Sequence, residues 1–452
     1  MRIPELEKTL GIEVYASQSP GIGGRLRQLP EDFVVEEILI DGSKAEISPV
    51  KGPQPLGRGR YLVCAMVKRN WDTFHATKTV AKRLGVSPEQ MSIAGIKDAK
   101  ALTAQHISIS RTLPEQVAGV DIKGIALRPL RFSNEKMYSE LLLGNEFHIL
   151  IRAISHKASV VEQRVKQVQA ELSAVGGVPN FFGHQRFGTI RPITHIVGRF
   201  LTQDNWEKAA LTYLAEPSQH EHPESREARR QLNDTQDFSS ALHSFPKSLR
   251  YERLMLRHLA KSPNDFVGAF RRLPIKLRRL FVQAYQSYLF NKFLSERIRH
   301  LSLTEVYAGD YVVKLGKHGL ATREVEQATA QSLQSFKKVL DENTMRVGIP
   351  LVGFRQGTSA GVQGEIEQKI LRAEGIEPQS FYIPAMPEIS APGRLRPVLA
   401  SIMNSSVDAV CKDSVNSSKR EVGLSFRLHR GSYATVVLRE FMKPQDLIKA
   451  GF

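Results

Sequence analysis

The first 155 residues of the chain contain short segments in which apolar and polar residues alternate, and this pattern constrains the fold more than any other feature. Alternation with a period of two is typical of half-buried strands. It predicts strands over residues 30–40, 61–67, 91–95, 103–110, 125–132 and 146–153. One helix is predicted among them, beginning after Asp72, whose side chain can cap it, and ending at Gly85. This part of the chain therefore predicts a sheet.

The sequence changes in character after these segments. A helix is predicted over 157–174, ending at Gly176 and Gly177, and Pro179 and Asn180 then predict a turn. From about residue 189 to residue 385 the sequence is charged and rich in helical patterns, which indicates a separate domain. Its clearest helix spans about 275–299, and one face of that helix carries residues expected in a core: Phe281, Ala284, Tyr285, Tyr288 and Leu289.

Near the C-terminus the alternation returns. A strand is predicted over 423–428, and a helix follows for which Ser432 is the candidate N-cap. Periodicity alone therefore indicates a mixed α/β assembly with a helical middle.

The charge of the chain points to a polyanionic partner. Lysine and arginine exceed the acidic residues by 17, and nucleic acid is the favoured partner because phosphate neutralisation needs many cations. An acidic membrane surface is the rival. No stretch approaches the roughly 20 apolar residues of a spanning helix, and the N-terminus lacks a signal-peptide pattern, so we expect a soluble, cytoplasmic protein.

The two cysteines, Cys64 and Cys411, have no CxxC companion. Their number and spacing indicate neither a disulfide framework nor a structural zinc site. We expect both to be small buried residues.

One motif is much more specific than the rest. Residues 95–105 fit the pattern G-x-K-D-x-x-A-x-T-x-Q, which closely resembles the signature of the TruD family of tRNA pseudouridine synthases. The resemblance covers almost the whole chain in order. Its other parts are Arg27, Pro30, Asp32, Phe33, Glu37, and residues 144–147, 178–188, 286–291 and 431–440.

The resemblance implies an α+β fold. The expected catalytic domain has a mixed, largely antiparallel sheet built from residues 1–188 and 386–452, and an α+β insertion domain over 189–385 interrupts it. The implied activity is isomerisation of uridine to pseudouridine in tRNA, with uridine 13 as the usual target. We expect no cofactor and no metal, and a monomer.

The resemblance also assigns two catalytic residues. Asp98 matches the family's nucleophile, and a carboxylate suits the role because it is ionised near neutral pH without help. Attack at C6 of uracil, attack at C1′ of ribose and removal of a 2′ proton all stay open. Arg27 matches the family's basic position, where a cation would keep the nucleophile ionised and oriented.

The same resemblance implies substrate-binding residues. Phe147 would stack on the flipped-out uracil and Asn145 would position it, since an extruded base needs an aromatic face and polar groups for its edge. A core position is the competing interpretation of Phe147. The remaining candidates are Phe33, Lys97, Asn180, Gln185 and Arg186, of which Lys97 is expected to contact RNA phosphate or to be structural. We expect Glu36 and Glu37 to face solvent, with Glu37 at most supporting the site.

Two other function classes fit less well. A non-catalytic RNA-binding protein would have no need of an intact Asp98 motif. A methyltransferase or a zinc deaminase would need a glycine-rich cofactor turn or a P-C-x-x-C signature, and the sequence has neither.

Overall fold

The computed structural model describes residues 2–48 and 57–452, and its largest element is a mixed sheet. The strands follow the order β13-β15-β6-β1-β4-β2-β5, while β3 pairs with β4 and β14 with β15. Their bounds are β1 Phe33–Leu39, β2 Tyr61–Arg69, β3 Met91–Ile93, β4 Leu102–Ser110, β5 Ile125–Ser133, β6 Leu142–Ile154, β13 Met403–Val407, β14 Cys411–Lys412 and β15 Arg420–His429. All neighbours are antiparallel except β1 and β4. The expected α+β fold with a largely antiparallel sheet is confirmed.

The centre of this large sheet is strand β1, which is buried along almost its whole length. It pairs with β6 on one side and with β4 on the other, and its register places Val35 opposite Phe147 and Glu37 opposite Asn145. Glu37 is fully buried and Glu36 nearly so. The expectation that both glutamates face solvent is therefore wrong.

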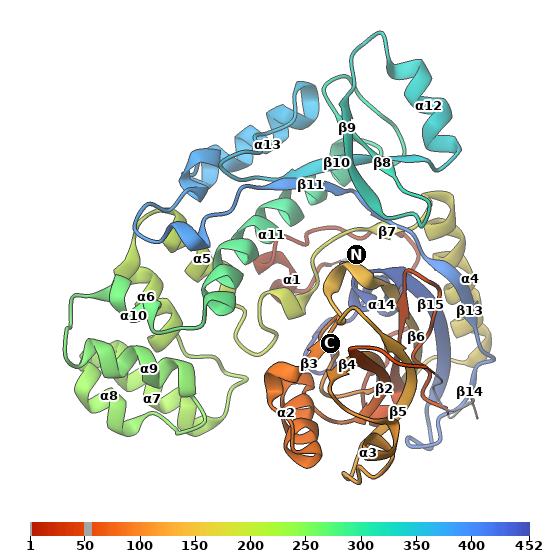
Figure 1. The fold of residues 1–452 in the computed structure, drawn as a ribbon. Coiled ribbons are helices and arrows are strands. Elements are labelled where there is room, and N and C mark those ends of the chain that lie inside the picture. Colours follow the sequence, from red (N-terminus) through yellow and green to blue (C-terminus); the bar gives the residue numbers. More distant parts are fainter. Residues whose placement is uncertain (1, 49–56) are drawn as a thin grey trace.

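Helices of the N- and C-terminal parts flank the large sheet (Figure 1). Helix α2, Thr73–Leu84, begins as expected, because the Asp72 carboxylate accepts a hydrogen bond from the backbone N–H of His75. It ends at Gly85, whose φ of 70° is favourable for glycine. Helix α4, Ala158–Ala174, packs against α14, Ala434–Met442. Short helices α1, Glu5–Thr9, and α3, Pro114–Ala118, complete these parts.

The middle of the chain forms a helical group, a long helix and a second sheet (Figure 1). The helical group comprises α5 Thr194–Thr202, α6 Trp206–Ala215, α7 Pro223–Thr235, α8 Phe238–Ser244, α9 Arg250–Leu259 and α10 Phe266–Arg271. The long helix α11, Ile275–His300, packs against α5 and against the second sheet. Its apolar face lies in the core, as expected, with Phe281, Ala284, Tyr285 and Leu289 buried.

The second sheet is antiparallel with the order β11-β10-β8-β9. Its strands are β8 Tyr311–Leu315, β9 Ala321–Gln327, β10 Met345–Leu351 and β11 Arg394–Pro397, and helices α12 Leu333–Asp341 and α13 Gly361–Glu374 accompany it. Strand β11 lies beyond residue 385, so this sheet extends past the boundary expected from the sequence. The division of the chain at residues 188 and 385 stays a prediction.

The chain leaves the large sheet and returns to it along neighbouring paths. Strand β7, Val178–Pro179, pairs antiparallel with β12, Leu399–Ala400, and the backbone N–H of Asn180 donates to the carbonyl of Val398 at 2.8 Å. The turn expected at Pro179 and Asn180 is therefore wrong, because a distant segment supplies a strand partner.

Three further observations concern single features. Ser432 does not cap α14, whose N-cap is Tyr433 with no side-chain hydrogen bond, so the expected cap is wrong. Cys64 is buried as expected, whereas Cys411 is exposed. Within residues 2–48 and 57–452, no helix combines the length and apolar composition needed to cross a membrane.

Candidate active site

The signature motif forms the loop between β3 and β4 and the first residues of β4. The side-chain amide of Gln105 donates to the carbonyl of Gly95 at 3.0 Å. The Thr73 hydroxyl, at the start of α2, accepts from the Lys97 N–H at 3.1 Å and lies 3.2 Å from the Lys97 carbonyl. These contacts fix the loop from the strand that follows it and from the helix that precedes it.

A buried lysine holds the loop at the candidate nucleophile itself. The ammonium of Lys68, on β2, donates to the backbone carbonyls of Asp98 and Trp71, each at 2.7 Å. Lys68 is fully buried, and burial lowers the pKa of its ammonium to about 8 although the nearby Asp98 and Asp72 raise it. Its position inside an apolar strand is a sequence signal that our interpretation missed.

The carboxylate of Asp98 is directed to the surface. Its side chain is 35% exposed, whereas Arg27, whose Nη2 lies 3.6 Å from the Asp98 Oδ1, is 10% exposed. Arg27 also donates to the carbonyl of Gly451 at 2.8 Å, and its guanidinium lies 3.9 Å from the centre of the Phe33 ring. Burial lowers the pKa of Arg27 and Asp98 opposes that shift, but a guanidinium stays protonated near neutral pH. The structure thus brings Asp98 and Arg27 together.

Behind the loop lies a buried polar network. The ammonium of Lys97 contacts Glu37 Oε2 at 2.8 Å and Asn145 Oδ1 at 2.7 Å. The backbone N–H of His106 donates to the other oxygen of Glu37 at 3.0 Å. Burial alone would raise the pKa of Glu37, but Lys97 and His106 hold it below its ordinary value. Because the Lys97 side chain is only 4% exposed, it orders Asn145 instead of facing solvent.

The two candidate stacking residues belong to the core. Phe33 is 1% exposed and Phe147 is 6% exposed. Their rings meet edge to face at 6.4 Å, and Phe147 also packs on Phe426 at 5.4 Å. A base could stack on the Phe147 ring only after neighbouring side chains move.

The remaining candidates lie where the chain crosses between the two sheets. Asn180 donates to the carbonyl of Pro397 at 3.0 Å, and Gln185 Oε1 accepts from the Thr435 hydroxyl at 3.2 Å. Arg186 donates to a serine and a glutamine of α11. In the described part of the chain, no hydrogen bond or ion pair joins these three residues to the group around Asp98.

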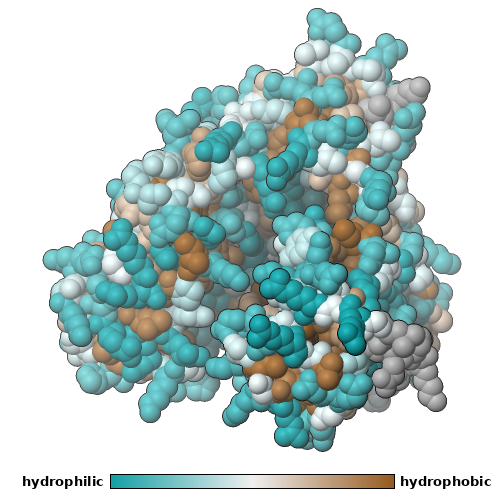
Figure 2. All heavy atoms as spheres, viewed as in Figure 1, coloured by the Kyte–Doolittle hydropathy of each residue, from teal (hydrophilic) through white to brown (hydrophobic). Residues whose placement is uncertain are grey.

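A cavity of about 400 Å³ lies beside Asn180 and the start of β6. Its walls include Leu142, at the start of β6, together with Asn180, Arg394, Arg396, His429 and Arg430. Leu142 also lies near the signature loop, because a methyl group placed on Gly95 would lie 3.3 Å from its side chain, but no residue of the loop lines the cavity. Figure 2 shows that hydrophilic residues dominate the visible face, which is hollowed between the helical group and the large sheet.

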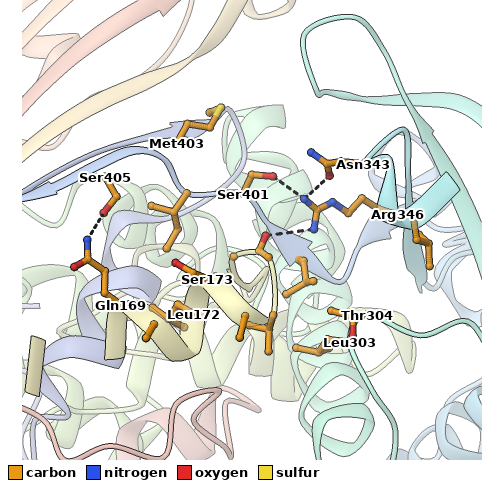
Figure 3. Close-up of a pocket in the computed structure, with 18 of the residues that line it drawn as sticks. Gln169, Leu172, Ser173, Leu303, Thr304, Asn343, Arg346, Ser401, Met403 and Ser405 are labelled. Atoms are coloured by element: carbon orange, nitrogen blue, oxygen red, sulfur yellow. Dashed lines mark hydrogen bonds between the residues drawn. The ribbon is translucent and has the colours of Figure 1, made fainter. Parts of the chain in front are cut away.

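A larger cavity of about 1040 Å³ lies between α4, β10 and β13 (Figure 3). Arg346 crosses part of it to donate to Asn343 and Ser401, while Gln169 and Ser405 are joined across another wall. None of the candidate site residues lines it.

Among the described residues, one group could hold a metal ion. Oxygen or nitrogen atoms of Glu36, Glu146 and His148 lie within 4.8 Å of one another. The ammonium of Lys44 already contacts Glu36 at 2.7 Å and Glu146 at 2.8 Å, and Arg427 contacts Glu146 at 3.1 Å, so two cations of this chain neutralise the two carboxylates.

The chain is similar to known proteins over almost its whole length. Residues 9–441 match the family model described as tRNA pseudouridine synthase D (TruD). A Methanosarcina barkeri protein with that name is 39% identical over 449 residues, covering 99% of both chains, and one from Methanosarcina mazei is 38% identical with the same coverage. A crystal structure titled as TruD from Methanosarcina mazei has a TM-score of 0.82 at 38% identity, covering 98% of this chain and 99% of that one. The chain therefore belongs to the TruD family of tRNA pseudouridine synthases, isomerases that convert uridine to pseudouridine.

Proposed function

We propose that this protein converts uridine 13 of tRNA to pseudouridine, with Asp98 as the nucleophile and a flipped-out base as the reacting group. One observation carries the proposal. Within the family's signature loop, the carboxylate of Asp98 is partly exposed and faces Arg27, while Lys68 anchors the backbone carbonyl of Asp98. A nucleophile must be accessible to substrate yet held in place, and this arrangement meets both needs.

In the proposed reaction the C1′–N1 bond breaks, the uracil rotates, and C5 bonds to C1′ while the C5 proton leaves and N1 gains one. Asp98 adds to C6 or to C1′ and is later released, or it removes a 2′ proton. Arg27 keeps the carboxylate ionised, because an adjacent cation favours the charged form. The reaction is an internal rearrangement that needs no cofactor and no metal.

The binding roles are part of the same proposal. Asn145, oriented by Lys97, meets the edge of the uracil, and Phe147 with Phe33 supplies an aromatic wall. Asn180, Gln185 and Arg186 line the path of the RNA. We further propose that the protein acts as a cytoplasmic monomer, with an insertion domain over 189–385 that forms the other side of the RNA-binding surface.

The experiment is a comparison of Asp98→Asn and Asp98→Ala with the wild-type protein. Both variants should bind tRNA with near-normal affinity and form no pseudouridine, since losing a nucleophile costs a factor of about 10⁴ or more. Asp121→Asn, which removes an exposed carboxylate on another loop, is the matched control and should keep full activity.

The measurement is the single-turnover rate, with pseudouridine mapped by chemical modification and with a chelator present. A rate above about a tenth of the wild-type value for either Asp98 variant would disprove the assignment of Asp98. Loss of wild-type activity on adding chelator would indicate a metal-dependent reaction.

A further inference from the structure

Three arginines come together where the chain returns from the second sheet. The guanidinium of Arg396 lies 4.1 Å from the centre of the Phe182 ring, and that of Arg186 lies 5.8 Å from the same ring. Arg394 is two residues before Arg396 on β11, so both side chains leave the strand on the same face. We call Arg186, Arg394 and Arg396 the arginine cluster.

No carboxylate of residues 2–48 and 57–452 neutralises this cluster. Arg396 donates to the backbone and side-chain oxygens of Asn180 and to the carbonyl of Gly431, and Arg186 donates to Ser287 and Gln283. All of these acceptors are neutral. Among the described residues, none of the three arginines forms an ion pair with an aspartate or a glutamate.

Other buried arginines of this chain are arranged differently. Arg229, Arg297 and Arg439 are each at most 1% exposed, and each contacts a carboxylate: Glu221 and Glu252, Asp310, and Glu7 with Glu440, respectively. Burying a cation without such a partner is costly. The pKa of Arg396 is lowered to about 9, mainly by burial, with Arg394 and Arg186 also lowering it and Tyr433 opposing them. The cluster therefore has a surplus of positive charge that an anion would neutralise.

An anion can reach this charge. Arg394 is exposed and lines both the cavity of about 400 Å³ beside Asn180 and a second cavity of about 550 Å³, whose wall includes Arg186. In the part of the chain that the structure describes, no hydrogen bond engages the guanidinium of Arg394, and Arg186 uses two of its donors, so donors remain for a ligand. Glu388, which also lines the second cavity, is held by Arg278.

We propose that Arg394 and Arg186 bind a backbone phosphate of the RNA beside the nucleotide that enters the active site, with Arg396 behind them adding charge and fixing Asn180. This inference rests on the proposed function, because it takes RNA as the ligand. The planar guanidinium suits a phosphate group, with which it can form two parallel hydrogen bonds. A contact at this place would set the register of the strand without reading its sequence.

The test uses the variants Arg394→Gln and Arg186→Gln, with Arg372→Gln as the matched control. Arg372 is exposed on α13 and its loss changes the net charge equally. Binding of unmodified tRNA is measured across salt concentrations. Loss of Arg394 should weaken binding about tenfold and reduce the slope of log affinity against log salt by about 0.7 to 0.9, whereas Arg372→Gln should do neither.

A second measurement uses an RNA stem-loop that contains the target uridine, with single phosphates replaced by neutral methylphosphonates. At one position near the uridine, the replacement should weaken binding of the RNA to the wild-type protein. Arg394→Gln should bind this RNA and the unmodified RNA equally well. If every replacement weakened both proteins equally, or if Arg394→Gln behaved like Arg372→Gln while pseudouridine formed normally, the phosphate site would be wrong. Absence of pseudouridine with the expected salt slopes would instead disprove the proposed function and leave an RNA-binding site.

Discussion

Phe147 provides the sharpest test of how the core and the candidate site are connected. Phe147 is only 6% exposed. Its ring meets that of Phe33 edge to face at 6.4 Å and packs on that of Phe426 at 5.4 Å. Replacing a buried phenylalanine with alanine typically costs about 3 to 5 kcal/mol. We expect Phe147→Ala to lose that much free energy of unfolding, which would obscure any effect on substrate binding.

Phe147→Leu separates the two roles because it keeps most of the apolar volume and removes the aromatic face. Its expected loss of stability is about 1 to 2 kcal/mol. If the ring stacks on the flipped uracil, worth about 1 to 3 kcal/mol, the leucine variant should also lose about fivefold to 150-fold in single-turnover rate below saturation. Phe426→Leu is the matched control, since Phe426 packs on the same ring and has no proposed contact with the base.

The measurements are denaturant unfolding and single-turnover pseudouridine formation, at a temperature where each variant is folded. A wild-type rate of turnover in Phe147→Leu would show that the Phe147 ring does not stack on the uracil. Unchanged stability of Phe147→Ala would contradict the packing described for the core. Equal losses of turnover in the Phe147 and Phe426 leucine variants would show that the effect is general to this part of the sheet.

Two further predictions concern buried ionisable residues. Lys68→Met should slow single-turnover pseudouridine formation more than tenfold with little change in tRNA affinity. Each carbonyl left without a donor costs about 1 to 3 kcal/mol, so the Asp98 loop would loosen. Partial recovery is expected in Lys68→Arg, and a wild-type rate in Lys68→Met would contradict the anchoring role. Burial raises the pKa of Glu367 to about 7, so its neutral form is favoured in the folded protein. Stability should therefore fall by about 3 kcal/mol as the pH rises from about 4.5 to about 7, and denaturant unfolding of Glu367→Gln should lack this part of the pH dependence.

Local signals predicted the secondary structure where a few neighbouring residues determine it. The cap at Asp72, the stop at Gly85 and the buried face of α11 depend on contacts within one helix or on one apolar stripe. Interactions between distant segments were missed. The turn expected at Pro179 is a strand because β12 lies beside it, and Ser432 is close to Asn180 instead of capping α14.

The family resemblance predicted the residues of the candidate site, but it did not predict the buried polar residues that hold them in place. Asp98 and Arg27 were paired in advance and lie 3.6 Å apart. Glu37 was assigned to solvent because charged residues in strands usually face water, but Lys97 and His106 supply the partners that make its burial possible. For Lys97 both an RNA-phosphate contact and a structural role were left open, and its contacts with Glu37 and Asn145 are structural. The ion pair between Glu37 and Lys97 joins segments far apart in the sequence, so neither residue alone predicts it.

The charges around Asp98 explain why neighbours in sequence have different tasks. Lys97 precedes Asp98 directly, yet its ammonium is neutralised by Glu37 at 2.8 Å and contributes little net charge to the site. Among the described residues, Arg27 has no carboxylate beside it apart from Asp98, and Lys68 lies near the carboxylates of Asp98 and Asp72, so the fields of both cations act on the nucleophile. Lys68 acts through the backbone of the loop and Arg27 through the side chain. Removing Glu37 would therefore release the charge of Lys97 toward Asp98 and Asn145, and it would disturb the site even though Glu37 is itself fully buried.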